Sequence, residues 1–371
     1  MSITTIELRI RDFIATEFLG GDDLTLDAET PLLGLGVIDS LNMVILLAFL
    51  ESEYGVVVSG EMVTPSNFES IHRMATLVDS LVGQQTAATP STAGAWSVFE
   101  QAFNLLVSEG IQRRRFTTSR GESLHYLATE GNEPTWMLLP GMGTPSSSWG
   151  SMLQMMTNER CAIAVDYLGF GPSQGTTDRP THRQQLAAVL ELVDAVVPGQ
   201  MIIVGNSAGA LVATELARRR ADRVAALVVA GFGLLDDPQG WWDKLVSRSR
   251  APEEFLHFAY YHPPKYTPNL QAILEHILGS PAYLSFLEDG GLAAMRDAFN
   301  DLSVPMLIVG GQQDGFFPPP SMAAAVRRVP GAHMELLARC GHFAPIEQPS
   351  ELLYIIDQFL RDLGKNPAGG A

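Results

Sequence analysis

Residues 201–210 read Met-Ile-Ile-Val-Gly-Asn-Ser-Ala-Gly-Ala, and this stretch decides the fold of the larger part of the chain. The first four residues form an apolar run suited to a buried strand, and a helical pattern begins at Ala208. Gly205 and Gly209 flank Ser207 at the spacing of a nucleophile elbow, a sharp strand-to-helix turn. Such a turn strains the serine backbone by about 1–3 kcal/mol, and only small neighbours leave room for it. We therefore expect the Ser207 hydroxyl to face a crevice above the strand ends, beside free helix N–H groups.

Strands and helices alternate along the chain from Phe116 onward. Helical patterns such as Arg183–Val196 and Ala208–Arg220 lie between short apolar runs suited to buried parallel strands, which are Thr135–Leu139, Cys161–Val165, Met201–Val204, Ala225–Val229 and Met306–Val309. This alternation predicts an α/β fold with a parallel sheet covered on both faces. Residues 232–300 interrupt it with mostly helical, aromatic-rich sequence, which predicts a lid over the sheet.

Two residues downstream of Ser207 have the order and the loop context of a catalytic acid and base. Asp314 comes directly after the strand predicted at Met306–Val309, and His342 precedes the last helix. From Phe116 to Leu363 the chain resembles the α/β-hydrolase superfamily. The resemblance implies that Ser207 is the nucleophile, His342 the general base and Asp314 the residue that orients it. It also implies an oxyanion hole formed by the backbone N–H groups of Ala208 and Met142.

Some residues near these motifs leave alternatives or depart from the family pattern. Pro140 stands in Pro140-Gly141-Met142-Gly143 where the family usually has His-Gly. The oxyanion hole survives this change because its donor is a main-chain N–H. Asp236 or Asp237, after the preceding strand, is the alternative to Asp314 as the triad acid. We expect Asp166 to bind loop backbone and Cys340 to be a packed thiol rather than a nucleophile.

The first 83 residues are predicted to form a separate helical domain. Their apolar residues recur at helical spacing in three stripes, which begin at Ile6, Leu41 and Ile71. The chain has a formal net charge of −17, and residues 1–85 contribute 13 acidic and three basic side chains to it. This acidity argues against nucleic acid and favours a partner surface rich in Lys and Arg.

The residues around Ser40 read Gly34-Leu35-Gly36-Val37-Ile38-Asp39-Ser40-Leu41. A serine at the first turn of a helix sits where backbone N–H groups and the helix dipole favour an anion, and Asp39 can cap that helix. This motif resembles the phosphopantetheine-attachment site of acyl and peptidyl carrier proteins, and the likeness extends over residues 1–82. It implies an all-α four-helix carrier bundle with 4′-phosphopantetheine on Ser40, attached by a phosphopantetheinyl transferase. An acyl- or aminoacyl-loading enzyme would supply the acyl thioester.

Residues 84–95 have no charge and no large apolar residue, so we expect a flexible linker between the carrier domain at 1–83 and the hydrolase domain at 96–371. A helix is predicted where Trp96, Phe99 and Phe103 recur at helical spacing. Two cysteines do not suggest a disulfide framework or a metal site. With no signal-peptide pattern and no membrane-spanning apolar run, we expect a cytoplasmic protein without a membrane partner.

Two serines with different roles give the functional hypothesis, in which Ser207 attacks a phosphopantetheine thioester on Ser40 and releases or transfers the acyl group. Hydrolysis would make the protein a thioesterase, and another acceptor would make it an acyltransferase or cyclase. A second hypothesis is cleavage of an ester or carbon–carbon bond while the substrate stays tethered. A third makes the protein a carrier with a non-catalytic hydrolase-like docking module, which the intact triad argues against.

Overall fold

The computed structural model describes residues 2–19, 26–35, 37–38, 40–82, 110–264 and 268–365. The chain divides into two compact units. The first comprises residues 1–109 with 264–276, and the second comprises 110–263 with 277–371. The linker expected at 84–95 and the helix expected from Trp96 lie outside the described residues.

The N-terminal part of the first unit is helical, as its stripes predict. Its elements are α1 (Ile3–Phe18), α2 (Ser40–Tyr54), a 3₁₀ turn η1 (Gly60–Met62), α3 (Pro65–Phe68) and α4 (Ile71–Leu81). Ile6, Ile10 and Ile14 are buried on one face of α1, because their spacing brings them to the same side of a helix. These residues belong to a core that this unit forms by itself, and the ring of Phe13 stacks on that of Phe49 at 3.9 Å.

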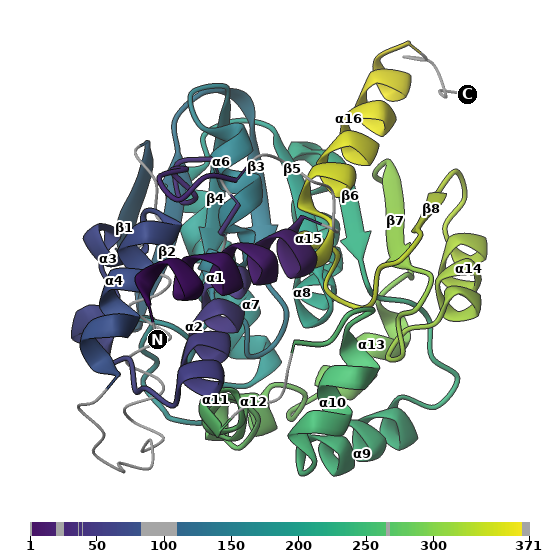
Figure 1. Cartoon of the computed structure of the whole chain (residues 1–371). Coiled ribbons are helices and arrows are strands. Elements are labelled where there is room, and N and C mark those ends of the chain that lie inside the picture. Colours follow the sequence, from purple (N-terminus) through teal and green to yellow (C-terminus); the bar gives the residue numbers. More distant parts are fainter. Residues whose placement is uncertain are drawn as a thin grey trace. The chain divides into compact units, whose positions relative to one another are not determined.

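An eight-stranded mixed sheet forms the centre of the second unit (Figure 1). The strand order is β1-β2-β4-β3-β5-β6-β7-β8, and the strands are β1 (Ile111–Thr117), β2 (Ser123–Thr129), β3 (Asn132–Leu139), β4 (Arg160–Val165), β5 (Met201–Asn206), β6 (Val224–Ala230), β7 (Met306–Gly311) and β8 (His333–Leu337). All six residues of β5 are buried, as a parallel strand covered on both faces requires. The five predicted strands are present.

The expectation of a parallel sheet is corrected at one edge. β1 pairs with β2, and β2 with β4, in antiparallel fashion, while β4 through β8 are parallel. The sequence of β1 contains three consecutive arginines, Arg113–Arg115, all exposed. A strand at the edge of a sheet has a neighbouring strand on one side only, so it needs no continuous apolar run. Its charged side chains protect the open edge from pairing with a strand of another molecule.

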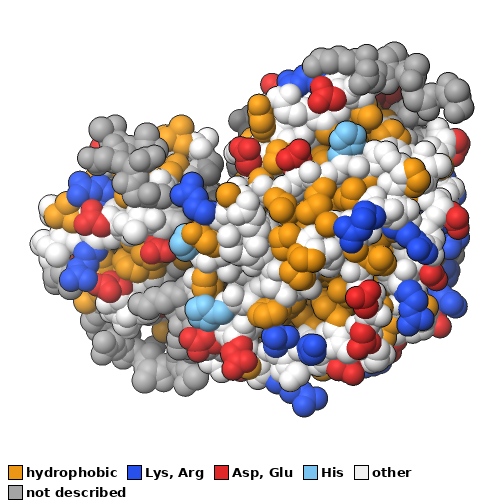
Figure 2. Space-filling view, turned by 90° about the vertical axis from the view of Figure 1, so that its right-hand side faces the viewer, with side chains coloured by type: hydrophobic (Ala, Val, Ile, Leu, Met, Phe, Trp, Pro, Cys, Tyr) orange, Lys and Arg blue, Asp and Glu red, His pale blue; other side chains and the backbone are white. Residues whose placement is uncertain are grey.

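Helices cover both faces of this sheet (Figure 1). They are η2 (Ser146–Trp149), α6 (Gly150–Met156), α7 (His182–Val196), α8 (Ala208–Arg219), η3 (Ala221–Arg223), α14 (Pro319–Arg328), α15 (Ala344–Glu347) and α16 (Pro349–Lys365). Helix α6 contacts α16, and α7 contacts α8. Both acidic and basic side chains lie among hydrophobic ones on the face of the molecule in Figure 2.

A mostly helical insertion separates β6 from β7, as predicted for residues 232–300. Its helices are α9 (Pro238–Ser249), α10 (Pro252–Ala259), α11 (Pro268–Leu278), α12 (Pro281–Ser285) and α13 (Gly291–Asp297). Four of the five begin with proline, whose fixed φ and missing N–H suit the first helical position. Most of α11 groups with the first unit, so we use the word lid for α9, α10, α12 and α13. No helix within the described ranges combines the length and the apolar character that crossing a bilayer requires.

Candidate active site

Ser207 lies on the sharp turn between β5 and α8, as its flanking glycines predict. Its backbone has φ 55° and ψ −123°, a left-handed conformation that is strained for a side chain with a β-carbon. A β-carbon on Gly209 would come within 2.2 Å of the Leu139 carbonyl oxygen, so only glycine lets the start of α8 approach β3. The turn therefore fixes the serine hydroxyl at the carboxyl ends of the strands.

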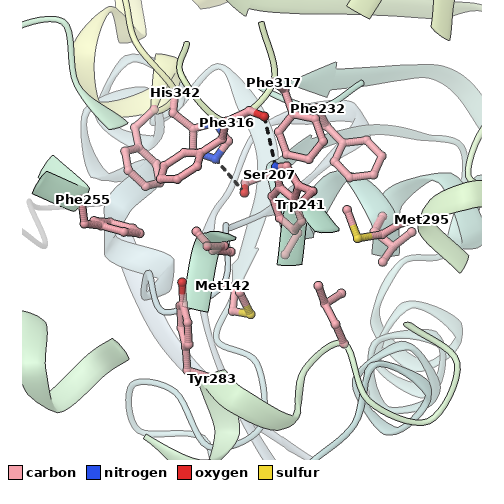
Figure 3. A pocket seen from close by; sticks show the side chains of 15 residues that line it. Met142, Ser207, Phe232, Trp241, Phe255, Tyr283, Met295, Phe316, Phe317 and His342 are labelled. Atoms are coloured by element: carbon pink, nitrogen blue, oxygen red, sulfur yellow. Dashed lines mark hydrogen bonds between the residues drawn. The ribbon is translucent and has the colours of Figure 1, made fainter. Parts of the chain in front are cut away.

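The structure brings His342 and Asp314 to Ser207. The Ser207 Oγ lies 2.8 Å from His342 Nε2 (Figure 3). On the other side of the imidazole, His342 Nδ1 lies 2.9 Å from Asp314 Oδ2. Asp314 and His342 are both 3% exposed. The second carboxylate oxygen of Asp314 accepts the backbone N–H groups of Phe316 and Phe317 at 2.8 and 2.9 Å, which leaves Oδ2 for the histidine. This is the geometry of a serine nucleophile, a histidine base and an orienting acid.

Asp236 and Asp237, the alternatives to Asp314, are both exposed. Asp237 caps the start of α9 by accepting the backbone N–H of Gly240 at 2.9 Å. Asp166, expected to bind loop backbone, accepts the N–H of Ser146 at 2.5 Å and pairs with His125 Nδ1 at 2.6 Å. Of the predicted acids, Asp314 is the one that contacts His342.

The two residues expected to supply oxyanion-hole amides both line the pocket at Ser207. Ala208 is the first residue of α8, so its N–H has no partner within that helix. Met142 directly follows Gly141. A β-carbon on Gly141 would lie only 3.3 Å from the β-carbon of Ser207, so this turn runs close to the nucleophile. Pro140 has no backbone N–H, but the expected donors are the N–H groups of Met142 and Ala208. The proline in place of the usual histidine therefore removes neither of them.

The pocket over Ser207 is small and almost entirely apolar (Figure 3). Its free volume is about 30 Å³, and its lining is Met142, Ser207, Ala208, Leu211, Phe232, Trp241, Leu245, Phe255, Tyr283, Leu287, Met295, Phe316, Phe317, His342 and Phe343. Burial raises the pKa of the Tyr283 phenol, so the hydroxyl stays neutral. None of these lining residues carries a fixed charge.

Three phenylalanines of this pocket surround His342, and the sequence interpretation missed them. The ring centroids of Phe316 and Phe343 both lie 4.9 Å from that of the imidazole, and Phe317 stacks on it at 6.0 Å. Each of them directly follows a predicted triad residue or lies within three positions of one, which is the signal that could have identified them. Four aromatic residues of the predicted lid segment line the pocket, and these are Phe232, Trp241, Phe255 and Tyr283.

Cys340 lies two residues before His342 and is buried, as expected of a packed thiol. Burial raises the pKa of this thiol, with a smaller contribution from the negative charges of Glu347 and Asp314. A thiol held in its protonated form is a poor nucleophile. Ser207 is therefore the nucleophile-type side chain that this geometry activates.

Comparisons with known proteins agree with this geometry. Residues 137–354, more than half of the chain, match the model of the alpha/beta hydrolase family. A pimeloyl-[acyl-carrier protein] methyl ester esterase of Aeromonas hydrophila is 26% identical over 62% of this chain and 96% of its own length. A 2-hydroxy-6-oxononadienedioate/2-hydroxy-6-oxononatrienedioate hydrolase of Burkholderia vietnamiensis is 27% identical over 64% and 91%.

A solved structure of a thermophilic esterase from Thermogutta terrifontis is also similar. It superposes with a TM-score of 0.56 at 25% identity, over 68% of this chain and 99% of that one. The family model begins at residue 137 and does not include the N-terminal helices. The family match, the mixed sheet and the elbow agree with one another, and the chain belongs to the alpha/beta hydrolase family, with the side-chain arrangement of a serine hydrolase at Ser207.

Proposed function

We propose that the protein hydrolyses an ester bond in an acyl group that its own N-terminal unit carries on Ser40. One observation carries this proposal: a single chain holds both kinds of serine. Ser207 contacts His342, which contacts Asp314, and Ser40 of the Gly34–Leu41 motif begins the second helix of the N-terminal unit. Similarity to an esterase whose named substrate is bound to an acyl-carrier protein supports the same pairing.

Ser40 suits the attachment of 4′-phosphopantetheine because it is the first residue of α2. A phosphodiester there would face the N–H groups and the positive end of the helix dipole. When bound, the group would supply a thiol that holds the acyl chain as a thioester. A phosphopantetheinyl transferase and an enzyme that loads the acyl group are the partners this implies.

Treatment of the purified chain with a phosphopantetheinyl transferase and coenzyme A is expected to add one prosthetic group, because the hydroxyl of Ser40 is its acceptor. Intact-mass spectrometry measures the gain, and Ser40→Ala removes the acceptor without touching the hydrolase unit. A wild-type mass that does not rise, or an equal gain in the variant, would refute the attachment site.

In the proposed reaction, His342 Nε2 accepts the hydroxyl proton while Ser207 Oγ attacks the ester carbonyl. The N–H groups of Met142 and Ala208 stabilise the negative oxygen of the tetrahedral intermediate. His342 then gives the proton to the departing alcohol, which leaves an acyl group on Ser207. A water molecule, deprotonated by His342, attacks this acyl-enzyme and releases the free acid, and Ser207 recovers its proton.

The pocket favours an ester as the bond that is cleaved, because a free volume of about 30 Å³ holds roughly two water-sized groups. A short alkoxy group has this size and needs no charged partner. Cleavage of the ester leaves the thioester and the tether intact, whereas the thioesterase hypothesis removes the acyl group from its arm.

Carbon–carbon bond hydrolysis is the second candidate, because the similar Burkholderia protein is named for a dioate substrate. A dioate carries two carboxylates, and burying one without a cation or several donors costs several kcal/mol. The described lining of the pocket holds neither lysine nor arginine. An uncharged ester therefore fits this pocket better than an anionic diketone acid.

A further inference from the structure

Glu347 ends the short helix α15, five residues after His342, and its carboxylate binds both neighbours of that histidine. The backbone N–H of Gly341 lies 3.1 and 3.0 Å from the two carboxylate oxygens, and the N–H of Phe343 lies 3.1 Å from Oε1. The acid therefore holds the main chain on each side of the imidazole. The reaction proposed above assigns it no role.

The same carboxylate binds the lid. Its Oε2 accepts the backbone N–H of Tyr261 at 2.9 Å, just beyond the end of α10. The N–H of His342 itself donates to the carbonyl of Ala259, the last residue of α10, at 2.6 Å. The end of α10 and the His342 loop are thus fixed to each other by Glu347 and by a direct backbone hydrogen bond.

Asn206 holds the remaining backbone group of His342 from the opposite side. Its Nδ2 donates to the carbonyl of His342 at 3.1 Å and to the carbonyl of Ala230, the last residue of β6, at 3.2 Å. Asn206 is 3% exposed and directly precedes the nucleophile. The side chain therefore links the histidine to the same turn that presents Ser207.

These contacts satisfy the N–H of Gly341, His342 and Phe343 and the carbonyl of His342. Burial raises the pKa of Glu347, and the N–H groups that it accepts oppose this effect. A carboxylate in this position is costly unless its hydrogen bonds are made, so the arrangement depends on all of them.

We propose that Glu347 is a positioning residue for catalysis, which acts with Asn206 and the Ala259 carbonyl as a backbone clamp that keeps His342 within reach of Ser207. The proposal rests on the esterase function of the Ser207 site. The clamp matters because the Ser207–His342 hydrogen bond of 2.8 Å depends on where the loop lies. A displacement of about 1 Å in such a site can cost about 10²-fold in rate.

Replacement of Glu347 tests the clamp, and the quantity to measure is kcat per active site. In Glu347→Gln the retained carbonyl oxygen can still accept from Gly341 and Phe343, but the new amide group faces the N–H of Tyr261. We expect kcat to fall about 10-fold in Glu347→Gln and about 100-fold in Glu347→Ala, with KM unchanged within about twofold. The measurement uses hydrolysis of an uncharged chromogenic ester by the full chain, with active sites counted by a serine-reactive phosphonate.

Glu351→Gln is the matched control, because Glu351 is an exposed glutamate on α16, and its kcat is expected to equal that of the wild type. A purely structural role would lower the melting temperature and the number of titrated sites while leaving kcat per site unchanged, and that result would overturn the proposal. If the Glu347 variants do not fold, Asn206→Ala is expected to lower kcat per site about 10-fold. An unchanged kcat in that variant would also overturn the clamp. An inactive wild-type chain would instead contradict the esterase function itself.

Discussion

Ser207→Ala is expected to lower kcat for ester hydrolysis by about 10⁴–10⁶-fold. The variant keeps the pocket, His342 and the backbone amides, but it has no hydroxyl to attack the carbonyl. The oxyanion hole and substrate binding alone leave a residual acceleration of about 10³–10⁴ over the reaction in water, which sets the lowest rate that the variant can reach. The measurement is hydrolysis of an uncharged ester at saturating concentration, together with labelling by a serine-reactive phosphonate.

Ser350→Ala serves as the control, because Ser350 is an exposed serine on α16 and takes no part in the site. It is expected to keep full activity and full labelling. Labelling of Ser207→Ala to the wild-type extent, or retention of more than a small fraction of its activity, would show that another group is the nucleophile.

Asp314→Asn is expected to lower kcat by about 10⁴-fold while leaving the fold intact. In the native protein Oδ1 accepts from Phe316 and Phe317, and Oδ2 accepts from His342 Nδ1. The single oxygen of asparagine can satisfy the two backbone N–H groups, which turns its amide nitrogen toward the imidazole. His342 must then accept at Nδ1 and carry its proton on Nε2, so that it can no longer take the proton of Ser207.

Asp236→Asn is the comparison for this prediction, since Asp236 is one of the two alternative acids in the sequence and Asp237 caps α9. Its kcat is expected to stay within about twofold of the wild type, as for a surface substitution. Equal losses in the two variants, measured as kcat per titrated site, would mean that the imidazole depends on neither carboxylate in particular.

The central strands could be predicted because burial on both faces requires a continuous apolar run. Residues 201–204 are such a run, and β5 is buried throughout. β1, β2 and β8 escaped prediction. β1 and β8 lie at the two edges of the sheet, and β2 belongs to its antiparallel part. In β8 only Leu337 is fully buried, so its sequence carries no run that distinguishes a strand from a loop.

The triad could be predicted because the order of its residues and the loops that carry them are local in the sequence. The pocket wall could not, because Leu211, Met295 and Phe255 come from three helices that meet only in the folded protein. The role of Glu347 was hidden for a different reason. Its partners are backbone N–H groups, and backbone groups leave no trace in the residue types.

Intact-mass spectrometry of the loaded chain tests the central claim most directly. Ser40 would be loaded by a phosphopantetheinyl transferase from a synthetic coenzyme A thioester whose acyl chain ends in a methyl ester. We predict that the mass of the wild-type chain then falls by the difference between the methyl ester and the acid, while the acyl group stays on its arm and loaded Ser207→Ala keeps the ester. Loss of the whole acyl group from the arm, or a tethered ester that survives while the same chain hydrolyses a free ester, would contradict the account.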